Sequence, residues 1–221
     1  MKKKSLLIFD LDGTLVDTLP SIAKAVNLCA KRFGFPERSL DEVRLAVGNG
    51  VGVLLQMTMP SDAMEDDARR EEIKRYFDVC YEQTQAEIDS CYDGIAEAVR
   101  GFYRDGYIIA VLSNKPDKLV RMIVENLFPD GIISVAMGQT DLPRKPDPTV
   151  PLMIAESFSI APEDVYFIGD SEVDVLTGRN AGMRTVAVSW GFRDRQVLAC
   201  AGPDVIIDNC GELADYFKKL A

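Results

Sequence analysis

The feature that most constrains the fold of this chain is a series of short, nearly continuous apolar runs separated by helical stretches. Parallel strands that are buried on both faces have this pattern, whereas antiparallel strands with one wet face alternate apolar and polar residues. The segments between most runs have the length of crossover helices. The runs lie at residues 6–9, 108–112, 132–135, 165–168, 186–188 and 205–207. The pattern predicts a doubly wound, Rossmann-like α/β fold around a parallel sheet.

A long interval, residues 10–107, separates the first apolar run from the second. Apolar residues recur there at helical spacing, and glycines and prolines divide the interval into short segments. The recurring positions are Ile22, Val26, Cys29 and Phe33, followed by Ile73, Phe77, Cys80 and Thr84. We therefore expect a helical domain, residues 16–89, inserted into a core domain that comprises residues 1–15 and 90–221. An insertion at this point would lie over the carboxyl end of the first strand as a cap.

Two carboxylates one residue apart, Asp10 and Asp12, directly follow the first apolar run. Residues i and i+2 of a strand point the same way, so both side chains can face one pocket at the end of the strand. One can then attack a phosphoryl group while the other moves a proton. Gly13 allows a sharp turn, and Thr14 adds a hydroxyl. The alternative is an ordinary turn, since Asp-Gly is also a common turn sequence.

The chain contains no histidine. This absence excludes Ser-His-Asp and Cys-His nucleophile systems, histidine phosphointermediates and histidine-ligated zinc or iron sites. Acid and base chemistry therefore falls mainly to carboxylates, Lys, Tyr or Cys. Because oxygen ligands are abundant, a bound metal is expected to be a hard cation such as Mg²⁺.

The net charge of -10 argues against non-specific binding to nucleic acid or to an anionic membrane surface. No hydrophobic stretch is long enough to span a bilayer. The five cysteines show no metal-like spacing, and reduced thiols in a cytoplasm are the simplest explanation. The same net negative charge means that an anionic substrate would need local positive charge, and the sequence leaves a monomer and a homodimer open.

Open α/β sheets bind ligands at the carboxyl ends of their strands, and polar residues after the later apolar runs provide three further candidate motifs. Ser113 and Asn114 can donate hydrogen bonds to phosphate oxygens, although capping of the next helix is an alternative role. Lys145 lies before a proline, and a held ammonium there would neutralise both a nucleophilic carboxylate and a phosphate. Its alternative is a surface lysine in a proline-rich loop.

The run at 165–168 is followed by Asp170, Ser171 and Asp174. The carboxylates of Asp10 and Asp170, together with the carbonyl of Asp12, would provide the few protein oxygens that Mg²⁺ prefers. Ser171 and Asp174 are expected beside these ligands, where they can hold the metal's waters. The alternative reading makes Asp170 a helix N-cap and Asp174 a first-turn residue favoured by the helix dipole.

The order of these motifs, Asp-x-Asp-x-Thr, Ser, Lys-Pro and Gly-Asp-x-x-x-Asp, resembles the haloacid dehalogenase superfamily of phosphohydrolases, including its C1-type helical cap. Residues 9–17, 47–50, 113–116 and 169–171 are similar to those of phosphoglycolate phosphatases. The resemblance implies that Asp10 forms an aspartyl phosphate and that Asp12 acts as acid and then base. It also implies a small phosphorylated metabolite as partner, Mg²⁺ as cofactor, and phosphate binding by Thr14, Ser113, Asn114 and Lys145.

The leaving group should be selected by the helical insertion. The loop Gly48, Asn49 and Gly50, leading into a helix at Val51, is expected to place backbone N–H groups near a second anionic group of the substrate. A simple connection between helices is the alternative.

Other activities remain to be weighed. Dehalogenation would not need Asp12, and related mutases use a cap histidine that this chain lacks. A pyrophosphatase or sugar phosphatase would have the same core motifs. A non-catalytic phosphate-binding module should lack the nucleophile, the acid or the lysine, and all three are present here.

Overall fold

The computed structural model describes residues 5–129 and 131–220. The chain divides into two compact units, which we describe separately. The sheet unit comprises Met1–Asp17 and Ser90–Ala221, apart from the residues outside the described ranges, and the helical unit comprises Thr18–Asp89. The boundaries expected from the sequence, and the role of the helical unit as a cap, stay predictions.

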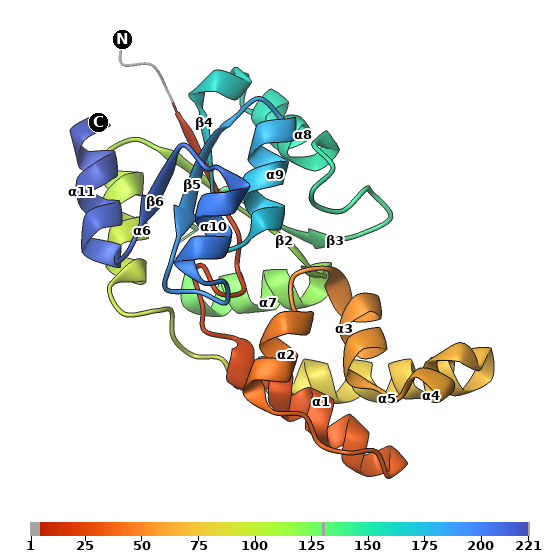
Figure 1. Ribbon diagram of the computed structural model, residues 1–221. Coiled ribbons are helices and arrows are strands. Elements are labelled where there is room, and N and C mark those ends of the chain that lie inside the picture. Colours follow the sequence, from red (N-terminus) through yellow and green to blue (C-terminus); the bar gives the residue numbers. More distant parts are fainter. Residues whose placement is uncertain (1–4, 130, 221) are drawn as a thin grey trace. The chain divides into compact units, whose positions relative to one another are not determined.

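The sheet unit contains a six-stranded parallel sheet with the order β3-β2-β1-β4-β5-β6 (Figure 1). The strands are β1 (Leu6–Phe9), β2 (Ile108–Pro116), β3 (Val135–Gln139), β4 (Val165–Gly169), β5 (Arg184–Val188) and β6 (Val205–Ile207). The first strand of the chain lies in the middle of the sheet, and the later strands extend it in both directions. This topology confirms the predicted doubly wound α/β fold, and it brings the carboxyl ends of β1, β2 and β4 together.

Helices cover both faces of the sheet. On one face Ile8 packs with Val150 and Ile154 of α8 (Thr149–Ser157), while α9 (Glu172–Asn180) approaches Phe167 so closely that Gly178 has no room for a Cβ. On the other face α6 (Ile95–Arg104) and α11 (Cys210–Leu220) pack together over an aromatic cluster that includes Phe9. The helices of this unit are α6 (Ile95–Arg104), α7 (Asp117–Leu127), α8 (Thr149–Ser157), α9 (Glu172–Asn180), α10 (Arg195–Ala201) and α11 (Cys210–Leu220), with a 3₁₀ turn at Pro162–Asp164.

One predicted strand is wrong in its placement. The apolar run at 132–135 is mostly a connecting segment, and the third strand is Val135–Gln139. Ile132 is buried without being part of the sheet, so its burial produced an apolar signal outside the strand. The strand itself contains Gly138 and Gln139, which a search for apolar runs does not select.

The helical unit is built from helices, as the periodicity predicts. They are α1 (Leu19–Phe33), α2 (Leu40–Ala46), α3 (Gly50–Thr58), α4 (Ser61–Glu65) and α5 (Asp67–Gln85). The apolar stripes of α1 and α5 are largely buried where the two helices pack against each other. The helix after the glycine loop begins at Gly50 rather than at the predicted Val51.

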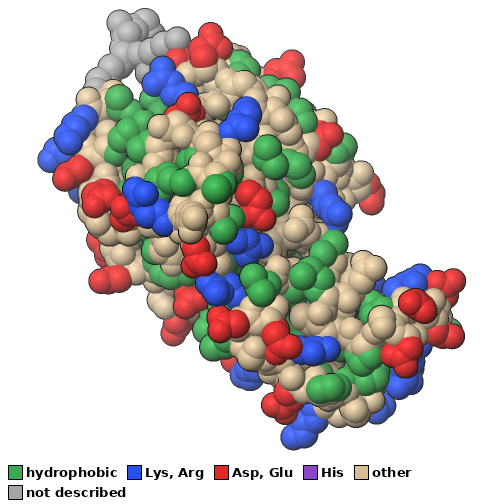
Figure 2. Space-filling model, viewed as in Figure 1, with side chains coloured by type: hydrophobic (Ala, Val, Ile, Leu, Met, Phe, Trp, Pro, Cys, Tyr) green, Lys and Arg blue, Asp and Glu red, His purple; other side chains and the backbone are tan. Residues whose placement is uncertain are grey.

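Charged side chains of both signs are interspersed on the face shown in Figure 2. The acidic side chains on this face are therefore not gathered in one patch. An anionic ligand needs cations close to its own binding site, and the sheet unit supplies two of them in buried positions, Lys115 and Lys145. Within residues 5–129 and 131–220, no helix is both long enough and apolar enough to cross a membrane.

Candidate active site

The segment after β1 is a tight turn whose backbone is held by its own hydrogen bonds. The N–H of Asp10 donates to the carbonyl of Ile168 at 2.8 Å, which ties the start of the turn to β4. The N–H groups of Thr14, Leu15 and Val16 then donate to the carbonyl of Leu11. Gly13 has a φ of 83° in this turn, a left-handed conformation that favours glycine.

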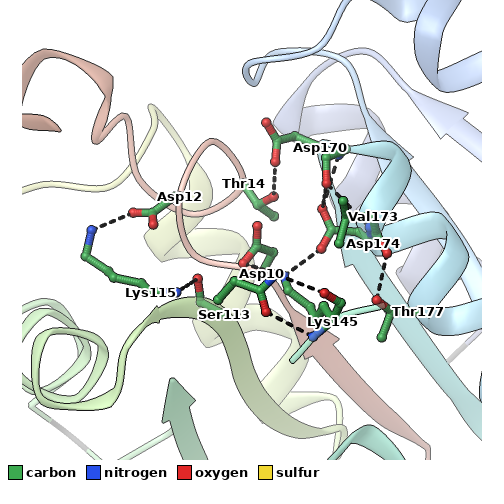
Figure 3. Close-up of polar contacts among 12 residues, drawn as sticks. Asp10, Asp12, Thr14, Ser113, Lys115, Lys145, Asp170, Val173, Asp174 and Thr177 are labelled. Atoms are coloured by element: carbon green, nitrogen blue, oxygen red, sulfur yellow. Dashed lines mark hydrogen bonds and ion pairs between the residues drawn. The ribbon is translucent and has the colours of Figure 1, made fainter. Parts of the chain in front are cut away.

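Lys145 lies at the centre of the site (Figure 3). Its Nζ is 2.8 Å from Asp10 Oδ1 and 2.7 Å from Asp174 Oδ1, and its side chain is only 4% exposed. The amide of Asn114 holds the backbone of Lys145 on both sides: its Oδ1 accepts from the lysine N–H and its Nδ2 donates to the lysine carbonyl. Lys145 is therefore a buried ammonium between two carboxylates, and the alternative interpretation as a surface lysine is wrong.

Asp170 is held beside this cluster by groups from two other segments. The hydroxyl of Thr14 donates to Asp170 Oδ1 at 3.3 Å, and the backbone N–H of Phe192 donates to Asp170 Oδ2 at 2.6 Å. A Cβ on Gly13 or Gly191 would collide with the Asp170 side chain. These glycines therefore leave the space in which the carboxylate lies.

Ser171, not Asp170, is the N-cap of α9. Asp174 completes the capping box, because its Oδ2 accepts from the Ser171 hydroxyl at 2.5 Å and from the Ser171 N–H at 3.1 Å. Its Oδ1 accepts from Lys145. Both oxygens of Asp174 are thus engaged, which suits a residue that positions others.

The electrostatics of the cluster reflect its burial. Burial, together with the nearby carboxylates of Asp174 and Asp12, raises the pKa of Asp10 to about 7 despite the opposing charge of Lys145. Burial, Asp174 and Asp10 also hold the pKa of Asp170 well above its usual range. For Lys145, burial lowers the pKa, but the charges of Asp10 and Asp174 outweigh it and raise the pKa overall.

The residues present fit a divalent cation. Oxygens of Asp10, Asp170 and Asp174 lie within 4.8 Å of one another, and all three residues are buried. Asp10 Oδ1 has no hydrogen-bond donor in good geometry among the described residues, since the contact from Lys145 is an ion pair. Buried carboxylates that outnumber their ammonium partners must be neutralised, either by protons or by further positive charge. Hard oxygen donors of this kind suit Mg²⁺.

Sequence reasoning assigned no role to Lys115. Its Nζ donates to Asp12 Oδ1 at 2.9 Å, and Figure 3 shows the two side chains pointing toward each other. The lysine side chain is fully buried and the aspartate side chain is 11% exposed. A lysine directly after the Ser-Asn pair at the end of β2 was the available signal, but its partner lies on another strand end.

The other predicted residues are placed as follows. Ser113 is buried at the end of β2, where its Oγ accepts from the Lys115 N–H at 3.3 Å and keeps its own proton for donation. Phosphate binding by Thr14, Ser113 and Asn114 stays a prediction. Gly48 and Asn49 lie between α2 and α3 in the helical unit, Gly50 begins α3, and contact of this loop with substrate also stays a prediction.

Comparison with known proteins identifies the family. A model described as haloacid dehalogenase-like hydrolase matches residues 7–188. Phosphoglycolate phosphatase 1 of Pseudomonas aeruginosa is 32% identical over 212 residues, which cover 94% of this chain and 78% of that protein. The phosphoglycolate phosphatase of Vibrio cholerae is 31% identical, with 97% of each chain covered. A crystal structure from Haemophilus somnus, described as a predicted phosphoglycolate phosphatase, has a TM-score of 0.90 at 31% identity and covers 100% of both chains.

The chain therefore belongs to the haloacid dehalogenase-like hydrolases. The relatives at this level of identity are named as phosphatases, and the chain is an enzyme of this class.

Proposed function

We propose that this enzyme is a Mg²⁺-dependent phosphomonoester hydrolase that acts on phosphoglycolate, or a closely similar small metabolite, through an aspartyl-phosphate intermediate. The observation that carries the proposal is the buried cluster in which Lys145 bridges Asp10 and Asp174, with Asp170 beside them. The relatives named phosphoglycolate phosphatases support the substrate class.

In the proposed reaction, a carboxylate oxygen of Asp10 attacks phosphorus, forming the aspartyl–phosphorus bond while the bond from phosphorus to the alcohol oxygen breaks. Asp12 gives its proton to the departing oxygen. It then takes a proton from the water that hydrolyses the aspartyl phosphate, which regenerates both carboxyl groups. Lys145 and Ser113 hold the equatorial oxygens of the phosphoryl group.

Asp10, Asp170 and the carbonyl of Asp12 would hold Mg²⁺. When bound, the cation supplies the positive charge that offsets repulsion between an anionic nucleophile and an anionic phosphate. Asp174 orients Lys145, and Ser171 orients Asp174, so that the ammonium stays directed at Asp10.

The substrate is tested by measuring phosphate release with Mg²⁺ from phosphoglycolate, pyrophosphate, sugar phosphates and nucleoside monophosphates. Ethyl phosphate is the matched control, because it has a methyl group where phosphoglycolate has a carboxylate. We expect phosphoglycolate to be preferred over ethyl phosphate by about 10-fold or more in kcat/KM, the value of one charge-assisted contact. A preference for pyrophosphate or a sugar phosphate would keep the mechanism and overturn the substrate assignment.

The raised carboxyl pKa values predict how stability depends on pH. Between pH 3.8 and about 7 the unfolded chain has lost the Asp10 proton while the folded protein retains it. The folded state binds more protons in this window, so the free energy of unfolding of the metal-free protein should fall as pH rises through it, and level off above it. Thermal unfolding of the metal-free protein, measured across this pH range, checks the prediction. A Tm that rises with pH across the range would contradict it.

Mg²⁺ should counteract this loss of stability at higher pH. Because metal ligands must be deprotonated, we expect Mg²⁺ to raise Tm more at about pH 8 than at about pH 5. The Asp170→Asn variant should lose the Mg²⁺-dependent increase, whereas Asp164→Asn, a change of the same kind outside the site, should retain it. An increase of equal size in Asp170→Asn and in the unaltered protein would remove Asp170 from the metal site.

The predicted cytoplasmic location belongs with this proposal, since five scattered cysteines suit a reducing compartment. All five cysteines have free thiols in the structure. Whether the enzyme acts as a monomer or a homodimer is to be decided by its mass in solution.

A further inference from the structure

We propose that Lys115 is a positioning residue for Asp12: its buried ammonium fixes the carboxyl group that protonates the departing alcohol. The inference rests on the proposed phosphatase function. Its basis is the contact between Lys115 Nζ and Asp12 Oδ1, 2.9 Å long, which joins the end of β2 to the turn after β1. The two residues are 103 positions apart in the chain.

The burial of this pair calls for an explanation. Lysine is almost never fully buried unless its charge is paired, and burying an ion pair costs a desolvation penalty that its attraction often does not repay. Lys115 nevertheless has a side chain with 0% exposure, at the edge of the sheet where the site lies. A role in the site accounts for a pair that stability alone does not favour.

The backbone at Lys115 is held rigidly. Its backbone N–H donates to Ser113 Oγ, and the neighbouring strand approaches so closely that a Cβ on Gly138 would collide with the carbonyl of Lys115. Gly138 N–H in turn donates to Asp117 Oδ1 at 2.9 Å, which fixes the start of α7. The Lys115 ammonium therefore extends from a backbone that has little freedom to move.

The turn around Asp12 is fixed in its backbone, so the side-chain torsions are what remain to be set. The contact from Lys115 is made to Asp12 Oδ1, so Asp12 Oδ2 is the oxygen that carries the proton for the departing alcohol. The two carboxylates of the Asp-x-Asp motif therefore have separate ammonium partners: Lys145 forms an ion pair with Asp10, and Lys115 forms one with Asp12. Orientation within a narrow range is what a proton donor needs in the transition state.

The dependence of the rate on the leaving group tests this role. As the phosphoryl group transfers to Asp10, the proton from Asp12 moves to the oxygen of the departing alcohol. A strongly basic alkoxide needs this proton in order to leave, whereas 4-nitrophenolate does not. We therefore expect Lys115→Met to lower kcat/KM by about 10²-fold for ethyl phosphate and for phosphoglycolate, but by less than about 5-fold for 4-nitrophenyl phosphate. The ratio kcat/KM is used because it excludes the later hydrolysis of the aspartyl phosphate.

Two further variants sharpen the test. Asp12→Asn should show the same dependence on leaving group, and adding Lys115→Met to it should cause little further loss, since both act through one carboxyl group. Lys118→Met makes the same change of charge at an exposed position and should alter neither class of substrate. If Lys115→Met does not fold, Lys115→Gln keeps a donor without the charge and is measured in the same way.

Other results would overturn the proposal. An equal loss for all three substrates would mean a general structural defect. A loss for phosphoglycolate with normal ethyl phosphate turnover would assign Lys115 to binding the substrate carboxylate instead. If the unaltered enzyme hydrolysed no phosphate ester, the proposed function itself would fail, and the role of Lys115 with it; a fully active enzyme with unchanged ratios in Lys115→Met would overturn that role alone.

Discussion

Asp10→Asn is expected to lower kcat by at least about 10⁴-fold, since loss of a nucleophile removes the covalent route altogether. The amide has nearly the shape of the carboxylate but cannot form the acyl phosphate. The fold should persist, because Lys145 keeps its contact with Asp174 at 2.7 Å. The measurement is steady-state release of phosphate with Mg²⁺, accompanied by circular dichroism and thermal unfolding of the variant.

A burst experiment separates the nucleophile from the other carboxylates. With 4-nitrophenyl phosphate, Asp12→Asn should still release nitrophenol in a first turnover and then stall at hydrolysis of the intermediate, whereas Asp10→Asn should release none. Asp17→Asn is the matched control, because it makes the same chemical change at an exposed position just beyond the turn. Retained steady-state turnover by Asp10→Asn would refute the assignment of the nucleophile.

The sequence is sufficient to predict the parts of this molecule that depend on local pattern. Buried parallel strands are continuous apolar runs, so β1 and β4 were located within a residue of their ends. The ends of such strands then pointed to Asp10 and Asp170, because the carboxyl edge of a parallel sheet is where side chains from distant segments meet. The prediction failed at β3, where a buried connecting segment carried the apolar signal and the strand contained Gly138 and Gln139.

Contacts that depend on which strands become neighbours could not be predicted in the same way. The pairing of Lys115 with Asp12 exists because β2 lies beside β1, and a lysine after Ser-Asn gives no sign of its partner. The support of Asp170 by Phe192 N–H was missed for the same reason: a backbone donor has no sequence signature. Trp190 Nε1 donates a hydrogen bond to the carbonyl of Thr14, another backbone contact between distant segments.

Gly13→Ala is expected to be the most damaging change that removes no functional group. An added Cβ would collide with the Asp170 carboxylate, and the left-handed φ of 83° would strain an alanine backbone. The collision should displace Asp170 from Asp10, so the affinity for Mg²⁺ should fall. A displacement of about 1 Å in a catalytic array costs about 10²-fold in rate, and we expect kcat/KM to fall by at least that factor.

The collision can be separated from the strain, because another glycine shares the strain alone. Gly106 has a φ of 94°, and nothing lies within 4 Å of the position of its Cβ. Gly106→Ala should therefore lose about 1–2 kcal/mol of stability, the cost of a left-handed conformation, while keeping full activity and Mg²⁺ affinity. If both variants lost activity equally, backbone strain would explain the effect. If Gly13→Ala kept full activity, the position of Asp170 would be less critical than its burial and its contacts to Thr14 and Phe192 imply.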